Sequence, residues 1–131
     1  MIPRFRAWYV LAEEMINEIL MISFVRKEII GKFRDGSTSV PLKFEDKRNG
    51  EDVILMQSTG LKDKNGKEIF EGDIVKMSKD VYSEPTYYEV VRHRGGAYRL
   101  ESKQHGCELW LRHTDCEVVG NVYENKELLD A

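Results

Sequence analysis

The chain has 131 residues, of which 41% are hydrophobic and 33% charged, and its net charge is −3. This apolar content excludes a chain that is disordered by composition, and the acidic balance argues against extensive phosphate-driven binding of nucleic acid. Two cysteines, no apolar run long enough to cross a bilayer and no cleavable leader predict a reduced, cytoplasmic protein that does not enter a membrane.

The first predicted elements lie between residues 4 and 25, where two interpretations compete. Helix-forming residues and apolar spacings of three and four across residues 8–22 favour a helix. Strand-forming residues at both ends of the segment, among them Phe5, Trp8 and Phe24, favour a β-hairpin. We expect strands, and keep an α+β fold with a helix in residues 8–22 as the alternative.

The next segment, residues 37–50, is polar, contains Pro41 and ends at Asn49-Gly50. Such a composition is typical of a loop, and we expect a mobile connection between two lobes. The predicted division is an N-terminal β-hairpin lobe and linker over residues 1–50 and a small β-barrel-like module over residues 51–131. One continuous domain is the alternative.

A hairpin is predicted over residues 60–75. Asn65 and Gly66 stand between two segments that could pair, and both residue types tolerate the positive φ that tight turns require. A second turn is expected at Gly72, before an apolar strand that begins at Ile74.

The C-terminal half shows turn signals roughly eight to twelve residues apart, which are typical of a small barrel or a curled sheet. The predicted strands are residues 87–92, 97–101, 108–111 and 117–123, followed by a helical turn at 125–129. We therefore predict a mainly β protein with a small curled sheet or SH3-like barrel in this half.

Three blocks of sequence stand out: Arg-Phe-Arg-Ala-Trp at residues 4–8, the long block of residues 55–75, and Cys-Glu-Val-Val-Gly-Asn-Val-Tyr-Glu-Asn from residue 116 with Glu-Leu-Leu at 127–129. Together these blocks resemble the YopX family of phage and prophage proteins. The resemblance covers nearly the whole chain and implies a mostly β fold, strands rather than a helix in residues 4–25, and an origin in a mobile element. It implies no catalytic, cofactor-binding or metal-binding residue.

Histidines and cysteines gather in one part of the chain. The candidate zinc ligands are His105, Cys107, His113 and Cys116, since zinc takes imidazole and thiolate ligands from short paired motifs. Their spacing matches known sites loosely, and Cys116 also reads as a buried apolar residue at the start of a strand. We expect no metal and no cofactor.

Acidic residues cluster at Asp63, Glu68, Glu71 and Asp73, and could hold a divalent ion or act in acid–base chemistry. Turn chemistry explains them better, because Asp63 and Asp73 lie beside turns where carboxylates accept hydrogen bonds from backbone amides. We expect these two to be structural, Glu68 and Glu71 to face solvent, and the chain to have no catalytic residues.

Aromatic residues of the C-terminal half could form a stacking platform for a single nucleic-acid strand, although cross-strand packing is their commoner role. They are Tyr82, Tyr87, Tyr88, Tyr98 and Trp110.

The sequence therefore predicts a non-catalytic binding or assembly protein that acts in phage–host biology in the cytoplasm of a bacterial host cell. We expect self-association through β edges and a host or phage protein as a possible partner. A small-barrel nucleic-acid-binding protein and a zinc-binding protein are the alternatives, of which the acidic balance makes the first less favoured.

Overall fold

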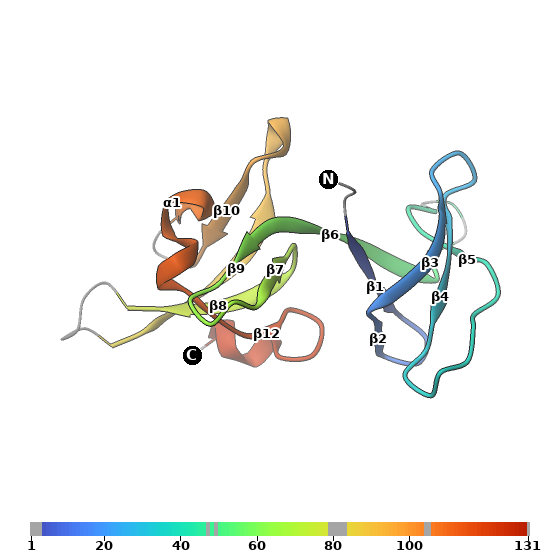
Figure 1. Cartoon of the computed structure of the whole chain (residues 1–131), viewed down its shortest axis with the longest axis horizontal. Helices are drawn as coiled ribbons and strands as arrows, with labels where there is room; N and C mark the ends of the chain where they lie inside the picture. The colour runs from blue at the N-terminus through green and yellow to red at the C-terminus, as the bar shows by residue number, and fades with distance from the viewer. Residues whose placement is uncertain (1–3, 47, 49, 79–83, 104–105, 131) are drawn as a thin grey trace. The chain divides into compact units, whose positions relative to one another are not determined.

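The computed structural model describes residues 4–46, 48, 50–78, 84–103 and 106–130. The protein is mainly β, and the chain divides into two compact units, Met1–Gln57 and Ser58–Ala131. Strand β6 (Val53–Lys62) contributes its first half to the first unit and its second half to the second unit (Figure 1).

The first unit contains two small groups of antiparallel strands. β1 pairs with β2 on one side and with β6 on the other, while β3, β4 and β5 pair in chain order. The strands are β1 (Phe5–Tyr9), β2 (Glu14–Ile16), β3 (Glu18–Ser23), β4 (Glu28–Lys32) and β5 (Leu42–Lys43).

The alternative of a helix in residues 8–22 is wrong, because this segment forms the end of β1, a turn, β2 and most of β3. The turn ends at Glu13, whose φ is 51°. The helix-like spacing has a β explanation. A bulge between Ile19 and Met21 inserts one residue, so that Ile19 and Ile22 both pack against the core although three positions separate them.

The core of the first unit joins both groups of strands. Its buried members are Ala7, Ile16, Ile29, Leu42, Phe44 and Val53. The strands approach closely at Gly31, where a Cβ atom would lie 2.5 Å from Cγ2 of Ile16 and 3.2 Å from the backbone oxygen of Glu18. Only glycine fits this position without a shift of the core.

The described residues of the segment 37–50 do not form a mobile connection between the units, since they belong to the first unit. The side chains of Leu42 and Phe44 are 4% and 1% exposed, and both belong to the core. The amide of Phe44 donates to the carbonyl of Lys27 at 2.9 Å, and the amide of Asp52 donates to the carbonyl of Lys43 at 2.8 Å. These contacts hold the segment against its neighbours.

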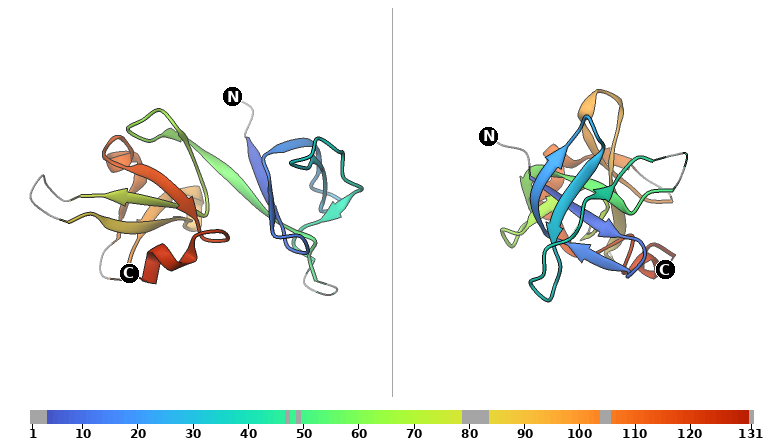
Figure 2. Two further views of the ribbon diagram at one scale, coloured as in Figure 1. Left: turned by 90° about the horizontal axis from the view of Figure 1, so that it is seen from below. Right: turned by 90° about the vertical axis from the view of Figure 1, so that its right-hand side faces the viewer.

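The second unit is built on a five-stranded, curled half-barrel sheet in the order β11-β10-β9-β8-β12 (Figure 2). Its strands are β8 (Asp73–Met77), β9 (Thr86–Arg92), β10 (Tyr98–Glu101), β11 (Gly106–Glu108) and β12 (Glu117–Asn121), and β7 (Glu68–Phe70) pairs with the second half of β6. The helical segments are α1 (Leu109–Arg112) and the 3-10 turns η1 (Arg94–Gly96), η2 (His113–Asp115) and η3 (Lys126–Asp130).

The predicted curled sheet is confirmed, and the hairpin of residues 60–75 forms as expected. Gly66 has a φ of 82°, and its amide donates to the carbonyl of Asp63 at 3.0 Å. The strand expected over residues 108–111 is wrong, because β11 ends at Glu108 and helix α1 follows directly. Among the described residues, no helix is long and apolar enough to span a membrane.

Candidate functional site

Three of the four candidate zinc ligands are described, and Cys107, His113 and Cys116 do not gather into a group that could hold a metal. His105 lies outside the described residues. The ring Nδ1 of His113 lies 2.7 Å from the carbonyl oxygen of Lys62, which can only accept, so Nδ1 carries the proton and is not available as a ligand. No group of three or more His, Cys, Asp or Glu residues that could hold a metal occurs among the residues that the structure describes.

The two thiols differ in their surroundings. Cys116 is completely buried in the core of the second unit, and its Sγ donates to the carbonyl of Arg112 at 3.2 Å. Burial raises its pKa to about 12, so almost none of it is thiolate at neutral pH. Cys107 is half-buried, and burial raises its pKa as well.

The folded protein should therefore be alkylated by iodoacetamide at Cys107 well before Cys116. A short exposure at pH 8, followed by mass spectrometry of the peptides, is expected to find the label on Cys107, because Cys116 becomes accessible only when its core opens. Denatured protein serves as the control and should take up both labels at similar rates. Equal labelling in the folded protein would contradict the burial of Cys116.

The acidic residues of the hairpin are mostly structural, as predicted. Asp73 is 2% exposed, and its Oδ2 accepts from the amide of Phe70 at 2.8 Å. The expectation that Glu68 and Glu71 face solvent is wrong, because both are half-buried, and Glu68 accepts a hydrogen bond from the hydroxyl of Ser58.

Asp63 connects the hairpin to the last strand of the sheet. Its Oδ1 accepts from the amides of Asn65 and Lys67, both at 2.9 Å, and its Oδ2 accepts from the amide of Val118 at 2.8 Å. Burial alone would raise the pKa of Asp63, but these three amides and the charge of Lys67 together lower it below 3.8. Both oxygens of the carboxylate thus accept hydrogen bonds from backbone amides, which is the structural role that turn chemistry predicts.

The aromatic residues that were candidates for a stacking platform lie in different surroundings. Tyr88 is 8% exposed and belongs to the core, and Tyr98 packs against the same core. Tyr87 precedes Tyr88 on the same strand and therefore points to the opposite face of the sheet. Trp110 is 64% exposed on α1, and Tyr82 lies outside the described residues. These residues do not form one stacking surface.

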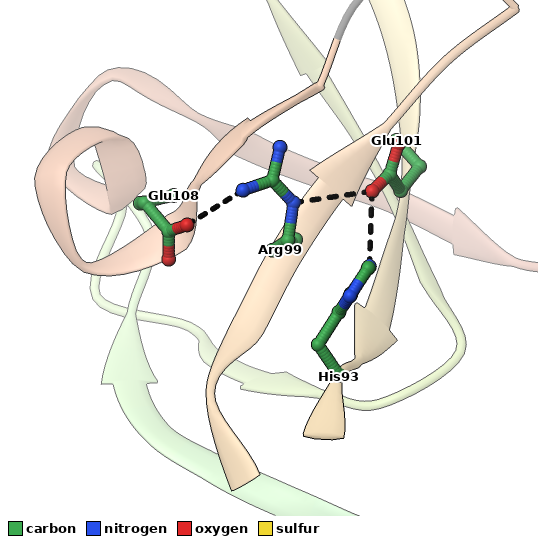
Figure 3. A network of polar contacts seen from close by, with 4 residues as sticks. All are labelled: His93, Arg99, Glu101 and Glu108. Carbon is green, nitrogen blue, oxygen red and sulfur yellow. Dashed lines mark hydrogen bonds and ion pairs between the residues drawn. The ribbon is translucent and has the colours of Figure 1, made fainter. Parts of the chain in front are cut away.

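A polar network that was not predicted joins β10, β11 and His93, the residue that follows β9 (Figure 3). Arg99 of β10 donates to Glu108 of β11 at 2.6 Å and to Glu101 at 3.2 Å, and the ring Nε2 of His93 lies 3.2 Å from the same Glu101 oxygen. The pKa of Arg99 is raised, mainly by its hydrogen bond with Glu101 and further by the negative charge of Glu108, although desolvation acts in the opposite direction. Arg99 therefore remains a cation.

Each member of this network is already bound to another member. Arg99 lies between two carboxylates, and Glu101 is shared by two donors. Arg99 and Glu108 are also register partners on neighbouring strands, which is the usual position of a cross-strand ion pair. We interpret the network as a partly exposed set of ion pairs that supports the pairing of β10 and β11.

The strongest candidate for a functional site is a groove in the first unit. It has a volume of about 620 Å³ and follows β3 from its start into the turn that comes after it. Its lining residues are mostly apolar, and they are Arg4, Phe5, Asn17, Glu18, Ile19, Leu20, Met21, Ile22 and Phe24. The ionisable side chains in this lining are the carboxylate of Glu18 and the guanidinium of Arg4.

Three large apolar side chains are exposed along this groove. Leu20 is 51% exposed, Met21 49% and Phe24 56%. The bulge in β3 explains the first two, because it turns two consecutive apolar residues outward while Ile19 and Ile22 remain against the core. Phe24 forms one wall of the groove, where its ring packs edge-on against Phe5 at a centroid distance of 5.9 Å.

β3 is also an edge strand. It pairs with β4 on one side, and none of the described residues pairs with its other side. An edge strand that carries exposed apolar side chains can accept a further strand from another chain. The sequence indicated β edges in general, but it did not locate this groove, because the bulge that exposes Leu20 and Met21 has no sequence signature of its own.

Comparisons with known proteins identify the family but no activity. The family model described as YopX protein matches residues 4–130. The crystal structure of protein EF1440 from Enterococcus faecalis has a TM-score of 0.66 and 31% sequence identity, and the match covers 98% of this chain and 99% of that chain. The crystal structure of yopX from Bacillus subtilis has a TM-score of 0.63 and 25% identity, with 95% and 96% covered. No curated protein matches significantly. This chain belongs to the YopX protein family.

Proposed function

We propose that this chain is a non-catalytic binding or assembly protein of a phage or prophage, which acts in the host cytoplasm and holds a protein partner in the groove along β3. The observation that carries the proposal is the combination of a groove of about 620 Å³ with an edge strand whose outer side chains are apolar. Soluble proteins seldom expose several large apolar side chains together unless another molecule covers them.

The chemistry of the groove favours binding over catalysis. Its lining includes Glu18 and Arg4 as ionisable groups, but no histidine, cysteine or hydroxyl that could act as a nucleophile or a general base with Glu18. The exposed backbone edge supplies hydrogen bonds of low sequence specificity, while the groove that Leu20 and Phe24 line supplies shape. An extended apolar segment of another polypeptide fits these features.

The proposal is tested by photo-crosslinking in bacterial host cells that carry the full chain. Met21→p-benzoylphenylalanine places the reactive group at the rim of the groove, and we expect a discrete crosslinked protein whose mass identifies the partner. Val40→p-benzoylphenylalanine is the matched control, since Val40 is 71% exposed in the same unit and does not line the groove. Crosslinks of equal yield at both positions, or none at Met21, would refute the groove as the binding surface.

A further inference from the structure

We propose that the occupant of this groove is a second copy of the same chain, which pairs its own β3 antiparallel with β3 across a two-fold axis. This inference rests on the proposed function and names its partner. A two-fold axis needs a surface that is complementary to itself, and an edge strand meets this requirement because antiparallel pairing brings the same backbone groups together from both copies.

The charges at the two ends of β3 fit this arrangement. Glu18 stands at the start of the strand, and its side chain is 61% exposed. Arg26 is exposed in the turn after the strand, and its guanidinium has no hydrogen bond or ion pair with any of the described residues. Antiparallel pairing about the centre of β3 sets Glu18 of each copy opposite Ser23 of the other. The turn keeps Arg26 close to Ser23, because the Arg26 amide donates to the Ser23 hydroxyl at 3.1 Å, so opposite charges approach each other at both ends.

Apolar side chains occupy the middle of the same strand. Leu20 and Met21 are about half exposed at its centre, and Phe24 is 56% exposed at its end. Pairing about the centre of β3 would bring the Leu20 and Met21 side chains of the two copies together and cover them, with charged residues at the rim. In an antiparallel pair, the apolar centre of one strand thus lies against the apolar centre of the other, and the charged ends lie against charged ends.

The bulge limits the strength of the contact. It interrupts the regular ladder at Leu20, so the two strands can share only a short run of backbone hydrogen bonds. Burial of these few apolar side chains then supplies most of the affinity. Because so few side chains and backbone hydrogen bonds take part, we expect an interface smaller than those of stable dimers, and a dimer that dissociates on dilution.

Sedimentation equilibrium of the full chain tests the inference. The wild-type chain is expected to shift from monomer to dimer as concentration rises. Glu18→Arg and Arg26→Glu should each weaken the dimer by about tenfold, because each places like charges together at both ends, whereas the double variant should recover most of the wild-type affinity. Loss of the Glu18–Lys32 ion pair affects folding little, since both side chains are exposed and their charged atoms are 4.0 Å apart.

Glu127→Arg is the matched control, because it changes the net charge by the same amount on an exposed residue of the second unit and should leave the dimer intact. A wild-type chain that stays monomeric at the highest concentration, or an assembly that responds equally to Glu18→Arg and Glu127→Arg, overturns the inference. Crosslinking from Met21 to a different protein alone would also overturn it, while the proposed binding function would stand.

Discussion

Asp63→Ala is expected to lower the free energy of unfolding by about 3 kcal/mol, since it leaves three backbone amides without their charged acceptor. Those amides belong to Asn65, Lys67 and Val118. The first two lie in the hairpin turn and the third in the final strand, so one side chain joins two distant parts of the second unit. Urea unfolding followed by circular dichroism measures the loss.

Asp35→Ala is a suitable control. Asp35 also accepts hydrogen bonds in a turn, from the amide of Ser37 at 2.8 Å and from its hydroxyl at 2.6 Å, but it is exposed and its contacts are local. Its loss should therefore lower stability far less than the loss of Asp63. An equally small effect of Asp63→Ala would contradict the role of Asp63 as the link between the hairpin and β12.

The same carboxylate predicts how stability depends on pH. The folded-state pKa of Asp63 lies below its ordinary value of 3.8, so ionised Asp63 favours the folded state. Its contribution is complete above pH 3.8 and is lost as pH falls through the lower, folded-state pKa. The difference in stability between the wild type and Asp63→Asn should therefore be constant near neutral pH and shrink in acid.

The β class, the hairpin and the role of Asp63 could be predicted because each depends on local chemistry. Asn65-Gly66 favours one kind of turn in almost any context, and a buried aspartate beside it has few uses other than capping amides. The family resemblance then favoured strands in residues 4–25, where propensity alone favoured a helix. The structure confirms that preference.

The groove could not be predicted because it depends on long-range pairing. The bulge at Leu20 arises where β3 pairs with β4 near Gly31. The sequence from Glu18 to Met21 is equally compatible with a regular strand, in which successive side chains point to opposite faces. The short helix at Leu109 was missed for a related reason. Most of the segment expected to be a strand is helical directly after β11, where tertiary packing buries Leu109 completely.

The segment of residues 37–50 was misjudged because a mostly polar composition does not show that Leu42 and Phe44 are buried in the core. Phe44→Ala is expected to destabilise the protein by about 3–5 kcal/mol, the usual cost of removing a buried aromatic side chain. Phe44 is 1% exposed and packs in the core with Ile29 and Val53. Val40→Ala, in the same loop but 71% exposed, should change stability by less than about 0.5 kcal/mol.

Hydrogen exchange can show which part of the protein Phe44→Ala destabilises. The two units have separate cores, so Phe44→Ala should accelerate amide exchange in β4 and β5 while β8 and β9 keep their protection. Phe44 also packs edge-on against Phe24 at a centroid distance of 6.1 Å, and Phe24 is a wall of the groove. The variant should therefore weaken binding at the groove as well as folding. If residues 37–50 were a mobile connection, neither exchange nor binding would change, because Phe44 would then support nothing.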